Sequence, residues 1–248
     1  MKFDSDQMKK RVRILLTGLI DLLYPPRCPI CDEVLVPGRK ICLACEKKIT
    51  RMKEPVCKRC GKQLDDMCRE YCLDCSRKTH RYTQGKAVFV YQGGIRQSMY
   101  RFKYANRREY ADFYAGEAAE LYRKWITDHD IEVIVPIPMY AGKQRRRGYN
   151  QAEVFARALG RELDIPVDAG LVRRVRNTTP QKKLNDKERK ANLKNAFQLS
   201  CNIVKYKQIL LVDDIYTTGS TMDAVAEVLQ SGENTRIYYI CISIGNGF

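Results

Sequence analysis

The sequence predicts an α/β protein with a parallel β-sheet covered by helices on both faces, preceded by an N-terminal helix and a small cysteine-rich domain. From residue 86 onward, short apolar runs alternate with amphipathic stretches, which is the order that builds such a sheet. Before them, eight of the eleven cysteines form Cys-x-x-Cys pairs. Such pairs are typical of bound metal in a reducing compartment rather than of disulfides.

Residues 5–23 are predicted to form an amphipathic helix within an N-terminal segment, residues 1–24. Its basic start and apolar run resemble a signal peptide, but Asp21 interrupts the run and Pro25-Pro26 replaces a small-residue cleavage site. No run approaches the roughly 20 apolar residues that span a bilayer. We therefore expect a cytoplasmic protein, with peripheral binding of the basic first turn to the inner face of the membrane as the alternative.

Residues 25–80 are predicted to form a double zinc ribbon. Each half supplies four thiolates, the number that a closed tetrahedral Zn²⁺ site needs, with Zn–S bonds of about 2.3 Å. Four cysteines leave no open coordination position, so we expect two structural ions whose binding supplies folding energy to a segment poor in core residues. The predicted ligands are Cys28, Cys31, Cys42 and Cys45 in the first half and Cys57, Cys60, Cys72 and Cys75 in the second.

Four further residues could belong to the ribbon or to the core. Cys68 is expected to be a spare thiol rather than a substitute ligand, and His80 is expected to face solvent. A redox switch through thiol pairing is an alternative role for the ribbon. Cys201 and Cys241 lie in or beside predicted strands, where a cysteine usually behaves as a small buried hydrophobe.

A polar, basic stretch at residues 76–85 is the expected boundary with a second domain, residues 81–248. Apolar residues at helical spacing predict helices in this domain, and short apolar or β-branched runs predict strands. In order, the predicted elements are strand 86–91, a turn at Gly93-Gly94, helix 95–104, helix 110–127, strand 133–138, polar loop 139–150, helix 151–163, strand 170–175, a hydrophilic loop 176–195, strand 209–212 with a following helix, and strand 236–243.

The most informative stretch, residues 209–221, joins a buried strand to a helix. Asp213 and Asp214 follow the strand, and Thr217-Thr218-Gly219-Ser220-Thr221 precede the helix. Free N–H groups and the positive end of a helix favour a phosphate, and Gly219 allows close backbone approach. Two carboxylates repel a phosphate unless sugar hydroxyls or a divalent cation lie between them. The stretch predicts a site for a phosphorylated sugar with Mg²⁺; the alternative is a ligand-free strand end with an ordinary helix cap.

Basic residues are in excess, with a formal net charge of +16. Such a charge favours polyanions, and arginine suits forked contacts with pyrophosphate or nucleic acid. Phe102, Tyr104 and Tyr149 lie among the charges, as in single-strand binders, although the same spacing also fits core-facing aromatics. Candidates for contact with pyrophosphate or DNA are Lys103, Lys143, Arg145, Arg146, Arg147, Lys182 and Lys183.

Taken in order, four motifs resemble the ComF family of competence proteins: the cysteine ribbon, Phe102-Lys103-Tyr104, the pair Pro136-Ile137-Pro138 and Arg147–Gln151, and the Asp213–Thr221 stretch. The last is similar to the 5-phosphoribosyl-1-pyrophosphate (PRPP) motif of type I phosphoribosyltransferases. This resemblance implies a type I phosphoribosyltransferase-like domain that binds PRPP with Mg²⁺. The acids, as the catalytic pair, would hold the ribose hydroxyls, and the 5′-phosphate would lie on the loop. The implied PRPP-binding residues are Asp213, Asp214, Thr217, Thr218, Gly219, Ser220 and Thr221.

The family resemblance implies a late competence protein that binds incoming single-stranded DNA at the cytoplasmic side of the uptake machinery. Implied partners are a ComFA-type DNA-dependent ATPase and, as a further candidate, DprA; the chain has no phosphate-binding loop of the ATPase type. One alternative is an active phosphoribosyltransferase with an unidentified acceptor, for which these motifs offer no histidine as general base. The other is an assembly scaffold that docks an ATPase through the ribbon.

Overall fold

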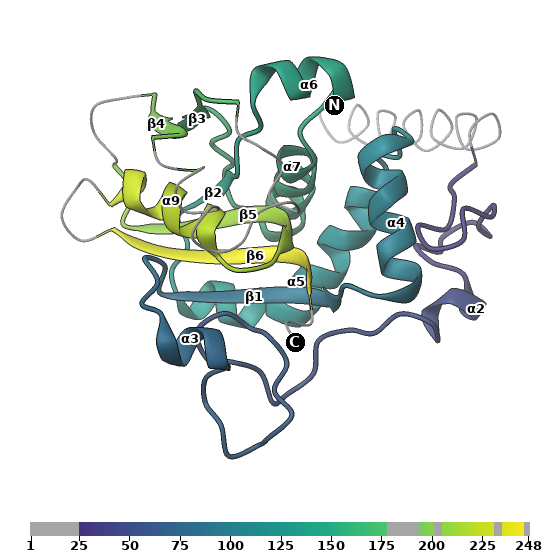
Figure 1. Cartoon of the computed structure of the whole chain (residues 1–248). Helices are drawn as coiled ribbons and strands as arrows, with labels where there is room; N and C mark the ends of the chain where they lie inside the picture. Colours follow the sequence, from purple (N-terminus) through teal and green to yellow (C-terminus); the bar gives the residue numbers. More distant parts are fainter. Residues whose placement is uncertain (1–24, 178–192, 194, 201–204, 231–234, 246–248) are drawn as a thin grey trace, which may run out of the picture. The chain divides into compact units, whose positions relative to one another are not determined.

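The computed structural model describes residues 25–177, 193, 195–200, 205–230 and 235–245 (Figure 1). The predicted N-terminal helix, Cys201, and the basic candidates Lys182 and Lys183 lie outside this range. The chain forms two compact units, Met1–Lys48 and Ile49–Phe248. The second half of the predicted ribbon therefore belongs to the same unit as the sheet.

The two halves of the ribbon share one local construction. In each half the first Cys-x-x-Cys pair lies in a tight hairpin: Cys28 N–H donates to Glu33 O at 2.8 Å, and Cys57 N–H donates to Lys62 O at 2.7 Å. The second pair opens a short helix, α2 (Leu43–Glu46) or α3 (Leu73–Arg77). The repeat seen in the sequence is therefore a structural repeat.

A four-stranded parallel sheet forms the centre of the larger unit. Its strands are β1 (Gln84–Val90), β6 (Arg236–Ile244), β5 (Gln208–Tyr216) and β2 (Val133–Pro136), in that order across the sheet. Apolar residues run continuously along β5 and β6 because both faces of the sheet are covered. A separate antiparallel pair is formed by β3 (Val172–Arg174) and β4 (Phe197–Leu199).

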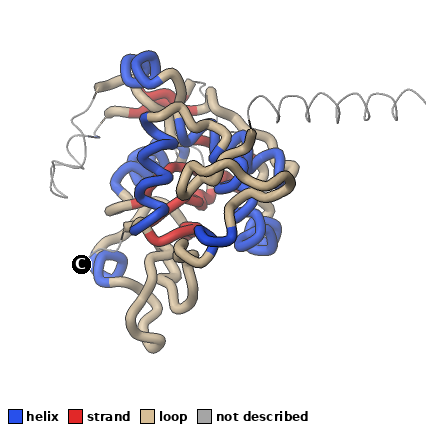
Figure 2. Tube along the Cα trace, turned by 90° about the vertical axis from the view of Figure 1, so that its right-hand side faces the viewer, coloured by secondary structure: helices blue, strands red, loops and turns tan. Residues whose placement is uncertain are grey.

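Different elements cover the two faces of the sheet. The helices α5 (Tyr110–Asp128) and α7 (Gln151–Leu163) pack against each other on one face. There α7 covers β2 and β5, and α5 covers β1 and β6. Alternate strand residues such as Leu211 and Tyr239 instead share a core with Val225 of α9 (Ser220–Leu229) and with Cys57 and Cys60 of the ribbon. The strands thus lie between helices on both sides (Figure 2). The predicted fold class is confirmed, with part of the ribbon acting as cover.

The remaining helices lie near the carboxyl ends of the strands, as Figure 1 shows. They are α4 (Gly93–Tyr104) and α6 (Ala141–Arg147). The helix predicted at 95–104 is confirmed, but the expected turn at Gly93-Gly94 is instead its first turn. The polar loop predicted at 139–150 is wrong in part, because Ala, Gln, Lys and Arg are good helix formers and only Gly148, at φ 88°, ends the helix.

The strand predicted at 209–212 is longer in the structure. β5 continues through both acids to Tyr216, because β6 keeps pairing with it at Asp213↔Cys241 and Tyr216↔Ile244. Hydrophobicity alone gave no sign of this extension. No helix in the described ranges combines the length and the apolar character that a membrane crossing requires.

Candidate functional site

The acid pair lies where two parallel strands end side by side. Pro136, the last residue of β2, pairs with Val212 of β5, and Ile137 N–H donates to Val212 O at 2.8 Å. The chain that leaves β2 therefore starts beside Asp213. Ligands of parallel sheets bind outside the carboxyl ends of the strands, so this edge is where a ligand is expected.

Lys103 brings the end of α4 onto the acid pair. Its Nζ lies 2.6 Å from Asp214 Oδ2, and the two side chains are only 18% and 17% exposed. Burial acts to lower the pKa of Lys103, but the charges of Asp214 and Asp213 outweigh it and raise that pKa. Lys103 therefore lies inside the site rather than projecting as a surface cation.

The pKa of Asp213 is strongly shifted. Burial and the neighbouring Asp214 raise the pKa of Asp213 to about 8. A hydrogen bond from Asp214 N–H to Asp213 Oδ1 at 2.8 Å and the cations Lys103 and Arg174 oppose the shift without cancelling it. At neutral pH the ligand-free pair thus holds a proton, which a bound cation or sugar hydroxyls could displace.

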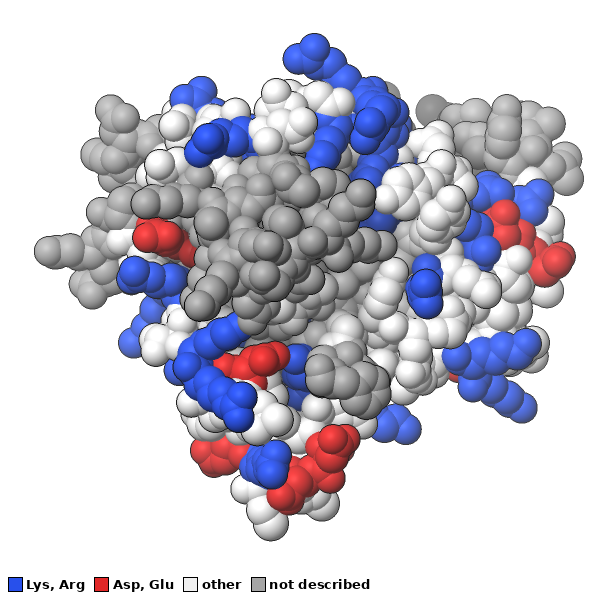
Figure 3. Space-filling view, in the orientation of Figure 1, with Lys and Arg blue, Asp and Glu red and all other residues white. Residues whose placement is uncertain are grey.

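Cations gather around Lys143. Burial lowers the pKa of Lys143, and so do the neighbouring charges of Arg174, Arg147 and Arg146. Arg174, on β3, also acts on Asp213. Lys and Arg atoms cover the surface over α6 (Figure 3), where Arg145 is exposed. Like charges held this close are typical of a site for a multiply charged anion.

Arg174 was not singled out in the sequence, because nothing local ties a residue of a three-residue strand to Asp213. The side chain is brought there by the β3–β4 pair, where its guanidinium carbon lies 5.4 Å from the centre of the Phe197 ring.

The hydroxyl-rich loop joins β5 to α9 as predicted. Gly219 occupies the left-handed region at φ 79° and caps α9, whose first residue is Ser220. The N–H groups of Thr217, Thr218 and Gly219 donate no hydrogen bond to another described residue. Together with the positive N-terminal end of α9, they form the cradle that an anion needs.

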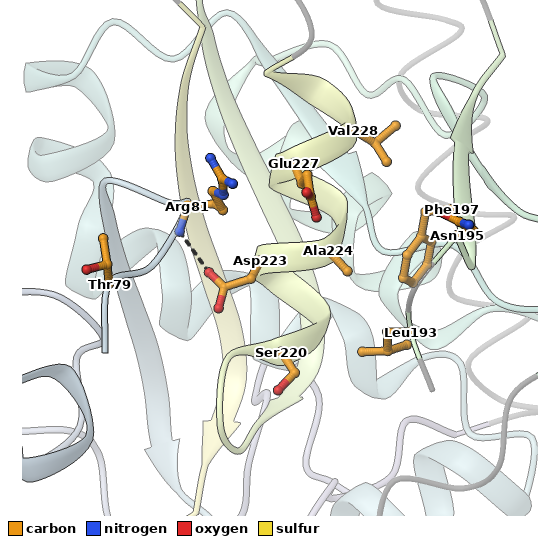
Figure 4. Close-up of a pocket in the computed structure, with 10 residues that line it drawn as sticks. All are labelled: Thr79, Arg81, Leu193, Asn195, Phe197, Ser220, Asp223, Ala224, Glu227 and Val228. Atoms are coloured by element: carbon orange, nitrogen blue, oxygen red, sulfur yellow. Dashed lines mark hydrogen bonds between the residues drawn. The ribbon is translucent and has the colours of Figure 1, made fainter. Parts of the chain in front are cut away.

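A cavity of about 690 Å³ lies alongside α9, away from the acids (Figure 4). Of the predicted site residues that the structure describes, only Ser220 lines it. Its other lining residues are Thr79, Arg81, Leu193, Asn195, Phe197, Asp223, Ala224, Glu227 and Val228. Because it carries two carboxylates and few cations, this cavity is a poorer anion site than the loop.

Both cysteine sets form as predicted. The four sulfur atoms of Cys28, Cys31, Cys42 and Cys45 lie within 4.8 Å of one another, and so do those of Cys57, Cys60, Cys72 and Cys75. All-thiolate sets of four fit closed structural Zn²⁺ sites. Cys68 lies outside both sets and Cys241 is buried, as expected.

Three side chains that were candidates for the surface are buried instead. Phe102 and Tyr149 are buried in the core, so neither can stack on a nucleic acid base. His80 is also buried, with 6% of its surface exposed, and the expectation that it faces solvent is wrong. Its Nδ1 lies 2.9 Å from Asp223 Oδ2 of α9. No local pattern in the sequence signals this contact, because it joins residues far apart in the chain.

The parallel sheet, the acids on β5 and the hydroxyl loop define a phosphoribosyltransferase-like domain carried behind a double zinc ribbon. Family models agree: a double zinc ribbon domain matches residues 19–76, and a phosphoribosyl transferase domain matches residues 149–243.

Among curated proteins, Competence protein F of Haemophilus influenzae is 34% identical over 210 residues, covering 82% of this chain and 90% of that protein. Competence protein ComFC of Bacillus subtilis is 28% identical, covering 82% of this chain and 88% of that protein. The DNA utilization protein YhgH of Escherichia coli is 28% identical, covering 89% of this chain and 98% of that protein. The chain belongs to the ComF family of competence proteins.

Solved phosphoribosyltransferases are similar at a low level. The purine phosphoribosyltransferase of Pyrococcus horikoshii is 15% identical, covering 53% of this chain and 73% of that chain with a TM-score of 0.34. The hypoxanthine phosphoribosyltransferase of Staphylococcus aureus is 14% identical, covering 54% of this chain and 62% of that chain with a TM-score of 0.33. The assignment of the fold comes from the sheet and the family model.

The raised pKa of Asp213 predicts how stability depends on pH. An aspartate in the unfolded chain has a pKa of about 3.9, so folding takes up a proton and stability falls as pH rises from about 4 through 8. Asp213→Asn removes this loss. We expect its melting temperature to exceed that of the parent protein by about 10 °C at pH 8, and by less at pH 5. Asp112→Asn, at an exposed carboxylate, is the control. A difference that does not change with pH would contradict the prediction.

Proposed function

We propose that this protein acts in DNA uptake and that its phosphoribosyltransferase-like domain binds PRPP with Mg²⁺. The arrangement of acids, cations and loop around the end of β5 is the observation that carries the proposal. Asp213 and Asp214 are assigned to the ribose hydroxyls and to the Mg²⁺ complex. Residues 217–221 are assigned to the 5′-phosphate.

The pyrophosphate is assigned to Arg174, whose charge acts on Asp213, and to the cations that cluster with it, Lys143, Arg146 and Arg147. A pyrophosphate near two carboxylates needs positive charge between and around them, and Mg²⁺ would supply the part between them. In the ligand-free protein Lys103 neutralises Asp214. Binding of Mg²⁺·PRPP therefore competes with this ion pair, and we expect Lys103 to turn toward the pyrophosphate.

We also propose that single-stranded DNA binds beside this site. Tyr100 and Tyr104 are 65% and 61% exposed on α4, and their ring centres lie 5.0 Å apart. The guanidinium carbon of Arg147 lies 5.0 Å from the centre of the Tyr104 ring. Exposed rings beside cations suit the bases and phosphates of a single strand. This tyrosine pair replaces Phe102 and Tyr149 as the candidate stacking surface.

The setting of this activity is proposed from the family: a late competence protein at the cytoplasmic side of the uptake machinery, whose partners are a ComFA-type ATPase and DprA. A role as a scaffold for that ATPase is a further proposal, and it is compatible with PRPP binding. Whichever partner is present, the sugar phosphate site can be tested on the protein alone.

The first test is calorimetric titration with Mg²⁺·PRPP. Binding should release protons at pH 7, because the complex favours ionised Asp213, whose pKa is about 8 without ligand. The heat should therefore depend on the ionisation enthalpy of the buffer, and affinity should rise with pH up to about 8. Asp214→Asn should abolish binding. Silence from folded, zinc-loaded protein would reject the PRPP assignment.

The second test is DNA affinity against salt. Binding through phosphates gives a log–log slope of about −0.7 per contacted phosphate on single strands. Replacing Tyr100 and Tyr104 by Ala should weaken binding at least tenfold while keeping the slope, because stacking contributes about 1–3 kcal/mol per base. Tyr206→Ala is the matched control: this ring also lies near a lysine, but at the opposite end of β5. Equal affinities for the parent and the tyrosine variant would refute this surface.

A transferase activity is the second candidate, favoured by the cations that could stabilise a departing pyrophosphate. If it operates, pyrophosphate should be released from PRPP in the presence of a suitable acceptor, tested across nucleobases and DNA. The background is the protein with Asp213→Ala and Asp214→Ala. Release no greater than this background would leave PRPP as a bound ligand only.

A further inference from the structure

We infer that His80 and Tyr82 are positioning residues that tie the 217–219 loop to the second cysteine cluster, Cys57, Cys60, Cys72 and Cys75. Metal binding at this cluster is then required for the loop to hold a phosphate, whereas the first cluster is not. The inference deepens the proposed PRPP site and rests on it for the identity of the ligand.

The segment 79–82 contacts the loop from both of its ends. Before the loop, Tyr216 Oη lies 2.7 Å from Tyr82 Oη. After it, Asp223 in the first turn of α9 accepts from Arg81 N–H at 2.9 Å, as Figure 4 shows, and from His80 Nδ1 at 2.9 Å. The segment therefore contacts the chain on both sides of the loop, and we call residues 79–82 the clamp.

The middle of the loop is held as well. A Cβ at Gly219 would lie 2.7 Å from Tyr216 Oη and 3.1 Å from His80 Cε1, so the imidazole and the phenol pack directly against this glycine. The His80 ring is in turn stacked on Tyr82, with centres 4.7 Å apart. Its Nε2 is buried and has no hydrogen-bond partner among the described residues. The position of the ring thus depends on Tyr82 and on Asp223.

The clamp is continuous with the second cluster. Tyr239 Oη donates to Cys60 O at 2.8 Å, and the Tyr239 ring stacks on Tyr216 at 5.0 Å with an angle of 7° between the planes. The carbonyl of the preceding residue, Arg59 O, accepts a hydrogen bond from Gly85 N–H at 2.8 Å. Burial raises the pKa of Tyr82, Tyr216 and Tyr239, so the hydroxyls stay protonated and their hydrogen bonds persist.

A Cys-x-x-Cys turn without metal would leave several thiols to be satisfied in a buried setting, and its backbone would relax. Because the Cys60 carbonyl and the segment after Cys75 are the attachment points, that relaxation reaches the loop. The first cluster lies in the other compact unit, Met1–Lys48, and serves as an internal control.

The test compares the two clusters in the full chain. Cys57→Ser with Cys60→Ser and Cys28→Ser with Cys31→Ser should each remove one zinc per chain. Hydrogen exchange of residues 216–223, measured without ligand, should quicken at least tenfold only in the first variant, and its affinity for Mg²⁺·PRPP should fall by about the same factor. Equal exchange in both variants would overturn the inference, even if the parent protein proves not to bind PRPP.

Point variants that keep both metals guard against loss of the fold. His80→Ala should quicken loop exchange and weaken Mg²⁺·PRPP about tenfold, as expected for a lost hydrogen bond to a carboxylate, while His80→Asn should recover part of both because its amide can donate to Asp223. Tyr82→Phe should act in the same direction. Tyr122→Phe is the matched control, since its buried hydroxyl bonds Ala87 O away from the loop. If His80→Ala and Tyr82→Phe keep parent exchange and two zinc ions, neither residue positions the loop.

Discussion

The rest of the structure depends on the burial of two adjacent carboxylates in a parallel sheet. Asp213 and Asp214 lie in β5 where it still pairs with β6, just beyond the end of β2, so burial and the neighbouring Asp214 oppose the ionisation of Asp213. Lys103 from α4 and Arg174 from β3 supply the compensating charge. This requirement explains why α4 and the small β3–β4 sheet converge on the carboxyl edge of the large one. It also makes the edge selective for a ligand that offers hydroxyls or a cation to the acids and an anion to the basic residues.

The zinc ribbon and the sheet are more closely joined than a two-domain description suggests. Cys57 and Cys60 share a hydrophobic core with Leu211, Tyr239 and Val225, so the ribbon and α9 together cover this face of the sheet. Tyr239 bonds the cysteine hairpin and stacks on Tyr216, whose hydroxyl bonds Tyr82 at the start of the phosphate loop. A metal site used in this way supports a binding loop as well as its own fold, which gives a physical reason for the two modules to occur in one chain.

Local patterns in the sequence predicted most of the fold. The strands of the large sheet and β3, the helices α4, α5 and α7 and both cysteine sets follow from periodicity and spacing, which act over a few residues, whereas β4 was not predicted. The acids and the loop were found because a strand followed by Asp-Asp and a run of hydroxyls is rarely needed for structure alone. Lys103 on Asp214, Arg174 near Asp213 and His80 on Asp223 could not be predicted, because each contact joins distant segments that only the folded sheet brings together. The extension of β5 was missed for the same reason: pairing with β6, not hydrophobicity, sets its length.

The most direct measurement is a crystal structure of the zinc-loaded protein with Mg²⁺·PRPP. The account predicts ribose hydroxyls on Asp213 and Asp214, the 5′-phosphate on the N–H groups of residues 217–219, pyrophosphate against Lys143 and Arg174, and Lys103 withdrawn from Asp214. A ligand bound elsewhere, or one whose phosphate leaves the loop empty while Lys103 keeps its ion pair, would contradict the account.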